Sequence, residues 1–147
     1  LICSVSKEED LIQKELLAEP YVLLSPPGWE EPEPWDVLFS RDVIGFQEQT
    51  RACSEIREML GEYGIVPVYT HNAPDEASIA ALVSYGFGYG IVPKVPPLKH
   101  YDLQISPLPT PNGSLTRRIY LTQLINRPPT GAAKRFLKYL LAHRLEE

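Results

Sequence analysis

The 147-residue chain has little sulfur and no long apolar run. It contains two cysteines, Cys3 and Cys53, whose number and spacing match neither a disulfide framework nor a zinc site, which favours a reducing, cytoplasmic setting. The longest apolar runs, such as Tyr21–Leu24 and Ile65–Tyr69, are far shorter than the roughly 20 residues that span a bilayer. No charged leader with an apolar run opens the chain, so neither a signal peptide nor a membrane partner is expected.

The chain also has fewer positively than negatively charged residues. The chain has 14 lysines and arginines against 19 acidic residues, for a net charge of -5, so nucleic-acid binding by its whole surface is not expected. Apolar residues make up 44% and charged residues 22%, which are ordinary globular values and exclude a disordered chain. The 15 prolines cluster between predicted elements and therefore punctuate a folded domain.

Motifs for nucleotides, metals and nucleophilic catalysis are missing. The glycines of Gly86–Gly90 follow a predicted helix and precede a strand, the reverse of the dinucleotide-binding order. His71, His100 and His143 lack the spacing of a metal site. Cys53 lies near a helix start, where a thiol pKa can fall, but a small buried apolar residue is the simpler interpretation. We expect no cofactor, no metal and no catalytic residue.

Strand and helix patterns alternate along the chain. Apolar and β-branched runs predict strands at 21–24, 43–46, 65–70, 89–92, 103–108 and 118–125. Apolar residues at helical spacing predict helices at 50–63, 75–85 and 130–145. The alternation indicates an α/β fold with a largely parallel sheet. Pro67 predicts an edge position for its strand.

The sequence patterns at the two ends of the chain need separate interpretation. Segment 7–17 has helical propensity, yet Ile12 and Leu16–Leu17 suit a strand beside Tyr21–Leu24, and the local pattern leaves both interpretations open. In the last helix we expect the apolar residues to face inward, namely Ala133, Phe136, Leu137, Leu140 and Leu141. The start at Leu1, without Met and inside an apparent strand, predicts that the chain is part of a longer protein.

Two strand-to-helix junctions carry polar residues that suit a small ligand. Segment Gly45–Arg51 runs from a strand end to a helix start, where open α/β sheets bind ligands. Free N–H groups at a helix start attract an anion, and Arg51 adds a forked donor, whereas Glu48 opposes an anion or pairs with Arg51. Neutral hydrogen bonds come from Gln47, Gln49 and Thr50. A solvated polar loop with a helix cap is the competing interpretation.

A second junction of similar character follows. Segment Thr70–Asp75 joins the next strand to the next helix and carries Asn72. Two such junctions side by side would form one wall of a ligand cleft.

The order of several motifs carries a family resemblance. A helix ends at Val83, the turn Gly86-Phe87-Gly88 follows, and a strand through Ile91 closes at Pro93. The matching segments upstream and downstream are 15–26, 64–67, 108, 118–124, 127–128 and 133–140. In this order the chain resembles the effector-binding domain of LysR-type transcriptional regulators.

The resemblance implies a fold like that of type II periplasmic binding proteins, with two α/β subdomains joined by crossing strands near Tyr21–Ser25 and Ile91–Lys94. Subdomain II would be 26–92, and the remainder of subdomain I would be 1–25 with 93–147. The first part of subdomain I and the DNA-binding helix-turn-helix region would be absent from this chain. The family pattern also makes 12–17 a strand.

The resemblance further implies a sensor and not an enzyme. A small anionic effector would bind in the interdomain cleft and shift the placement of subdomains and dimer partners. The residues that we expect to line the cleft are Gln47, Gln49, Thr50, Arg51 and Asn72, with Tyr89 or Gly90 at the hinge. The protein would be cytoplasmic, would form a homodimer or higher homo-oligomer, and would contact DNA only through the absent N-terminal domain.

Two other classes of protein share this scaffold. A solute-binding protein of a transporter would require export, so a signal peptide upstream of Leu1 would favour it, whereas a helix-turn-helix there would favour the regulator. A prephenate-dehydratase-like or deaminase-like enzyme would need a paired acid and base or a nucleophile. The chain shows neither motif, which argues against the enzyme.

Overall fold

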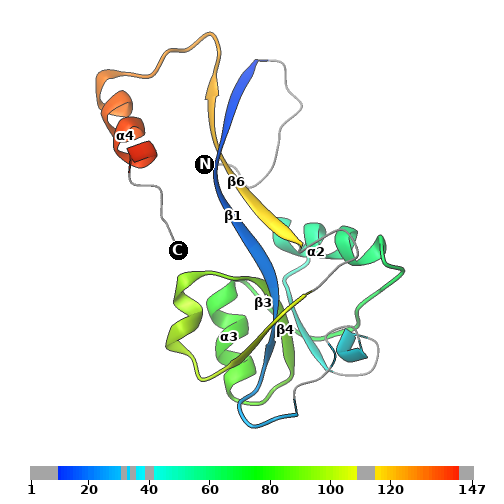
Figure 1. Ribbon diagram of the computed structural model, residues 1–147. Helices are drawn as coiled ribbons and strands as arrows, with labels where there is room; N and C mark the ends of the chain where they lie inside the picture. The colour runs from blue at the N-terminus through cyan, green and yellow to red at the C-terminus, as the bar shows by residue number, and fades with distance from the viewer. Residues whose placement is uncertain (1–9, 31–32, 34–35, 39–41, 109–114, 143–147) are drawn as a thin grey trace. The chain divides into compact units, whose positions relative to one another are not determined.

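The structure is a computed structural model that describes residues 10–30, 33, 36–38, 42–108 and 115–142 (Figure 1). The chain forms two compact units. The smaller unit comprises 1–19 and 116–147, and the larger unit comprises 20–115. The strand and the short helix that follow residue 93 pack within the larger unit.

The larger unit is built on a mixed sheet of order β3-β2-β4-β1-β5. Its strands are β1 (Leu11–Ser25), β2 (Val43–Phe46), β3 (Tyr69–Ala73), β4 (Tyr89–Pro93) and β5 (Gln104–Pro107). Strand β2 is parallel to β3 and β4, whereas β1 is antiparallel to β4 and β5. The prediction of a largely parallel sheet is therefore wrong for β1 and β5. Only β2, β3 and β4 are linked by the crossover helices that parallel neighbours need.

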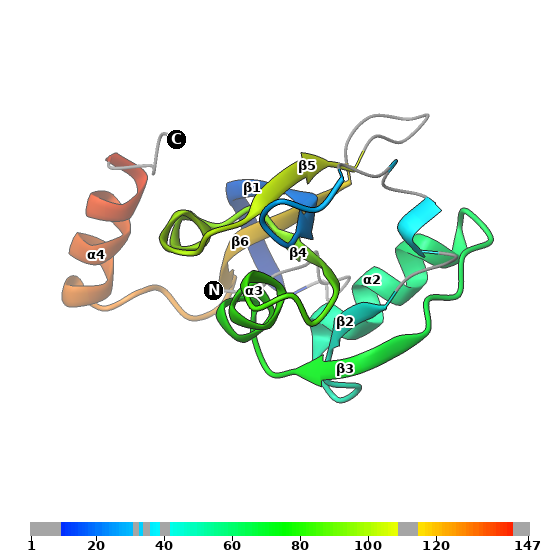
Figure 2. The same cartoon turned by 90° about the horizontal axis from the view of Figure 1, so that it is seen from below.

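Helices α2 (Arg51–Gly61) and α3 (Glu76–Ser84) provide these crossovers and confirm the helices predicted at 50–63 and 75–85. They lie on opposite sides of the sheet (Figure 2). Helix α2 buries Cys53, Ile56 and Leu60, which is the face that its periodicity predicts. Cys53 is thus a buried apolar residue, as its simpler interpretation holds. A 3-10 helix, η1 (Pro96–His100), lies in the proline-rich segment, for which no element was predicted.

One predicted strand is displaced along the sequence. The apolar residues of 65–70 predict a strand there, but β3 begins only at Tyr69 and continues through polar residues to Ala73. Val66 and Val68 are 82% and 76% exposed. Pairing with β2, and not apolar content, sets these limits, since Val43 lies opposite Tyr69 and Phe46 opposite Ala73. The predicted edge position is confirmed, because β3 ends the strand order.

Side chains from both faces of the sheet form the core of the larger unit. The largest fully buried residues include Leu23, Leu24, Ile44, Leu60 and Ile79. Helix α3 approaches β4 so closely that a Cβ at Gly90 would lie 2.6 Å from Ile79 Cγ2. Since full burial of one such side chain stabilises a fold by about 1.5–3 kcal/mol, this core holds the strand ends and helix starts in fixed positions.

In the smaller unit the first part of β1 pairs with β6 (Thr116–Leu124). Strand β1 includes 12–17, so the strand implied by the family pattern is confirmed there. Polar side chains link the two strands: Gln13 Nε2 donates to Thr122 Oγ1 at 3.0 Å, and Arg118 Nη1 donates to Glu15 Oε2 at 2.7 Å. These cross-strand partners outweigh the local helical propensity.

Helix α4 (Gly131–Ala142) confirms the described part of the helix predicted at 130–145. Of the five apolar residues predicted to face inward, Ala133, Leu137, Leu140 and Leu141 are the half-buried residues of α4. The prediction is wrong for Phe136, which is 58% exposed, and no residue of α4 is fully buried. Within the described part of the smaller unit, no packed layer covers this face. None of the helices in the described ranges is long and apolar enough to cross a membrane.

Candidate functional site

The two strand-to-helix junctions meet at one edge of the sheet. Because β2 and β3 are parallel, their last residues, Phe46 and Ala73, lie opposite each other. The backbone N–H of Gln47 donates to the carbonyl oxygen of Ala73 at 3.0 Å, which ties the two junctions together. Helices α2 and α3 begin a few residues later. We call residues 47–51 and 72–76 the junction edge.

Thr50 caps the start of α2 with a neutral hydroxyl. Its backbone is extended, and its Oγ1 accepts a hydrogen bond from the Cys53 N–H at 3.2 Å. The same hydroxyl donates to the carbonyl oxygen of Gln47 at 2.7 Å. The first turn of α2 contains no acidic residue. The positive end of the helix dipole is therefore not neutralised by a carboxylate in its own first turn.

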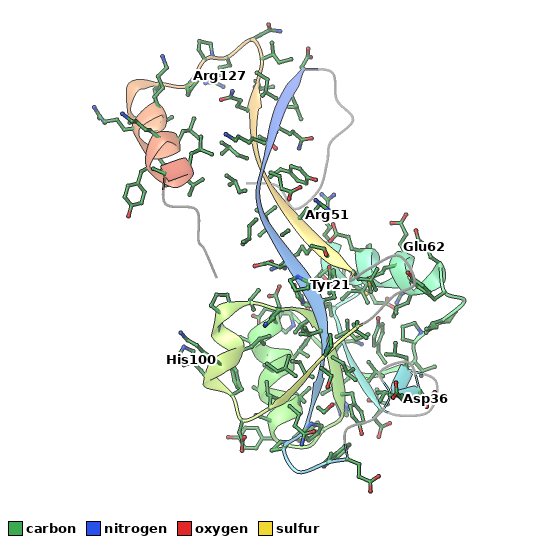
Figure 3. The ribbon with its side chains drawn as sticks, viewed as in Figure 1. Tyr21, Asp36, Arg51, Glu62, His100 and Arg127 are labelled. Atoms are coloured by element: carbon green, nitrogen blue, oxygen red, sulfur yellow. The ribbon has the colours of Figure 1, made fainter. Side chains whose placement is uncertain are left out.

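The charged side chains near α2 are paired with one another. Arg51, at the start of α2 (Figure 3), donates from Nε to Glu55 Oε1 at 2.9 Å. Glu48 lies 3.6 Å from Arg57 Nη2, so it faces this residue and not Arg51. The side chain of Arg51 is 57% exposed, and exposed pairs of this kind contribute only about 0.3–0.5 kcal/mol. A ligand anion could replace the Glu55 carboxylate at little cost.

The start of α3 has the same backbone geometry and a different charge. Asp75 is its N-cap, and its Oδ1 accepts from the Ser78 N–H at 2.8 Å. This hydrogen bond holds the pKa of the Asp75 carboxyl below its ordinary value of 3.8. Glu76 adds a second carboxylate in the first turn. An anion arriving at α3 would meet two negative charges.

Asn72 lies at the junction edge and belongs to β3, the outermost strand of the sheet. It is exposed and lies opposite Gly45 in the register of β2 and β3. The structure thus brings together the five polar residues predicted on the two junctions, which are Gln47, Gln49, Thr50, Arg51 and Asn72. Thr50 is half-buried and the other four are exposed, which leaves their polar groups accessible to a ligand.

Tyr69, the first residue of β3, packs its ring over Gly45 of β2, a contact that was not predicted. A Cβ at Gly45 would meet three atoms of the Tyr69 ring at 2.5–2.7 Å, so the ring occupies the place of a side chain. Burial raises the pKa of Tyr69 to about 12. The signal in the sequence was a glycine within an otherwise apolar strand, which marks a close approach of another group.

Tyr89 and Gly90 are not brought to the junction edge. They begin β4 and lie opposite Val43 and Ile44, at the other end of β2. Tyr89 is buried, and its ring packs edge-on against Trp29 with 5.3 Å between ring centroids. Gly90 lies beneath α3. These two residues therefore contribute to the core and do not line this edge.

In the described part of the chain, the histidines do not gather with other residues that could bind a metal ion. The ring of His71 packs edge-on against Phe87, with centroids 5.8 Å apart. His100 ends η1, and His143 lies outside the described residues. Across the described ranges, no three His, Cys, Asp or Glu residues come close enough to hold a metal ion.

Comparison with known proteins identifies a family. A family model described as LysR substrate binding domain matches residues 1–144. The effector-binding domain of QuiR in complex with shikimate is 22% identical, with a TM-score of 0.79, and the match covers 97% of this chain and 69% of that one. The regulatory domain of CcmR from Synechocystis PCC6803, in complex with 2-PG, is 15% identical, with a TM-score of 0.80 and coverages of 99% and 72%.

A third structure extends the fold comparison. The C-terminal domain of a probable LysR family regulator from Rhodococcus sp. RHA1 is 11% identical, with a TM-score of 0.77 and coverages of 94% and 71%. No curated protein sequence is significantly similar to the chain. Because these three structures are at most 22% identical to the chain, they show its fold alone. They confirm the predicted α/β, periplasmic-binding-protein-like class.

Proposed function

The chain belongs to the family of LysR substrate-binding domains, and from this premise we propose that it senses a small anionic effector for a DNA-binding regulator. One observation carries the assignment of the effector site: α2 begins with a neutral cap, no acid in its first turn and polar side chains around it. Backbone N–H groups at such a helix start favour carboxylate, sulfate or phosphate groups. Shikimate, which is bound in the QuiR structure, carries a carboxylate.

In this proposal Arg51 and the N–H groups of α2 bind the anionic group. The Arg51 guanidinium exchanges Glu55 for the effector, and Gln47, Gln49 and Asn72 hydrogen-bond to its neutral parts. The Thr50 hydroxyl fixes the start of the helix and donates either to the carbonyl of Gln47 or to the effector. Binding therefore reorganises side chains at the junction edge and leaves the backbone of β2 and β3 in place.

The wider assignment follows the family and is also a proposal. The protein acts in the cytoplasm, forms a homodimer or higher homo-oligomer, and reaches DNA through a separate helix-turn-helix domain. It switches without catalysis and needs no cofactor. The subdomain boundaries at 25/26 and 92/93 belong to this assignment. Membership of a regulator family does not favour the alternative of a transporter's solute-binding protein.

The test measures anion binding and the effector response of the full regulator. Shikimate and inorganic sulfate serve as probes, and the Thr50→Ala/Arg51→Ala double variant is compared with Ser54→Ala, an exposed residue on the same helix. Loss of a charge-assisted contact costs about 1.5–3 kcal/mol, so the double variant should bind roughly 10- to 150-fold more weakly. Equal binding by both variants would remove the site from the junction edge, and a regulator that no small anion affects would contradict the proposed effector class.

A further inference from the structure

We propose that the Glu19–Arg117 ion pair clamps β1 to β6 where the chain passes between its two compact units. The chain enters the larger unit after Glu19 and leaves it before Thr116. The two residues of the pair are therefore next to the two points of passage, although 98 positions separate them in the sequence.

The pair has the geometry of a strong and protected contact. Nε and Nη2 of Arg117 both reach Oε2 of Glu19, at 2.7 Å and 2.6 Å. The side chains are only 8% exposed for Glu19 and 15% exposed for Arg117. Charge-assisted bonds of this kind are about twice as strong as neutral ones, and water and salt screen them little when they are buried.

The backbone near this pair explains why a clamp is needed. Pro20 follows Glu19 in β1 and has no N–H group with which to pair a neighbouring strand. Its carbonyl oxygen accepts from the Lys94 N–H at 2.8 Å, on the side of β4. One residue later, the Tyr21 N–H donates to the Leu115 carbonyl at 2.7 Å. The side-chain pair thus joins the strands beside the position where proline removes a backbone donor.

A second pair on the same two strands provides a matched control. Glu15 and Arg118 are also an acid on β1 and an arginine on β6, with 2.7 Å between Arg118 Nη1 and Glu15 Oε2. Their side chains are 40% and 55% exposed. Exposed pairs contribute little to stability, so the chemistry is matched while burial and position differ.

The experiment measures amide hydrogen exchange residue by residue in the full chain. In Glu19→Gln, we expect the Tyr21 amide to exchange roughly tenfold faster, since a neutral acceptor replaces a charged one. Amides in the middle of α3 should keep their wild-type rates, because the opening is local. Glu15→Gln should leave the Tyr21 amide unchanged. The reversed pair, Glu19→Arg with Arg117→Glu, should restore part of the protection.

Three results would overturn the clamp. The first is a uniform acceleration of all amides of the larger unit in Glu19→Gln, which would indicate a general loss of stability. The second is an unchanged Tyr21 amide in Glu19→Gln, and the third is an equal effect of Glu15→Gln and Glu19→Gln on that amide. If Glu19→Gln does not fold, Arg117→Lys retains the charge without the fork, and the same comparison applies. No effector is used, so this test fails or succeeds independently of the proposed function.

Discussion

Helices α2 and α3 begin at the same edge of one sheet, yet their first turns differ in charge. Both follow parallel strands, and both have a capping side chain that accepts from the N–H three residues later. The cap of α2 is the hydroxyl of Thr50, whereas that of α3 is the carboxylate of Asp75 with Glu76 beside it. Backbone geometry therefore supplies two equivalent helix starts that differ in the charge of a few side chains, and in the proposed function this difference decides which one binds an anion.

The difference also separates two uses of a helix cap. At α3 the carboxylate stabilises the positive end of the helix within the protein itself. At α2 the neutral cap satisfies one N–H group, and in the proposed function the remaining electrostatic attraction acts on a ligand. The three predictions that follow test this comparison, from the largest expected effect to the smallest.

Thr50→Asp should make the start of α2 resemble that of α3. Aspartate is a good N-cap, so the free energy of unfolding should change little. The added charge should repel an anion and cancel a charge-assisted contact, which weakens the binding of shikimate or sulfate roughly 10- to 150-fold. Isothermal titration checks this, with Thr50→Ser as the control that keeps the hydroxyl. Unchanged anion affinity in Thr50→Asp would show that α2 is not the site.

Gly45→Ala should disturb the strand that holds both helix starts in register. The new Cβ would meet the Tyr69 ring at 2.5 Å, and overpacking of this kind costs roughly 1–3 kcal/mol. Chemical denaturation measures the loss. Gly61→Ala is the control, because its Cβ would meet nothing within 4 Å and alanine favours a helix over glycine by about 1 kcal/mol. Equal stabilities of the two variants would contradict the packing of Tyr69 on Gly45.

Asp75→Asn should lower the stability above pH 3.8 and so make its decline in acid less steep. The Ser78 hydrogen bond lowers the folded-state pKa of Asp75 below 3.8. This carboxylate therefore stabilises the fold above pH 3.8, and its contribution is lost as the pH falls through the lower folded-state value. Asparagine still caps the helix but does not titrate. Thermal unfolding from pH 2 to 7 should show a shallower acid decline for the variant, and identical declines would contradict the assigned role of Asp75.

Local patterns predicted the helices and the two junctions well. Periodicity locates α2 and α3 to within a few residues. The polar residues of 47–51 and Asn72 converge because carboxyl ends of parallel strands share an edge. Tyr89 opens its strand, so the same rule places it at the opposite end of β2, and its predicted place at the hinge stays a prediction.

Long-range contacts account for what the sequence did not reveal. Strand β1 contains Lys14 and Glu15 in a segment of helical propensity, and it becomes a strand because β6 supplies partners about a hundred residues away. The polar strand β3 is likewise fixed by pairing with β2. Local periodicity contains no information on these partners, nor on the clamp between Glu19 and Arg117.

The most direct test is a titration of the ¹⁵N-labelled chain with shikimate in which the chemical shifts of the backbone amides are measured. The account predicts saturable shifts at residues 51–53, at the start of α2, and no comparable shifts at 76–78, at the start of α3. Equal shifts at both helix starts, or shifts at neither while shikimate binds elsewhere, would contradict it.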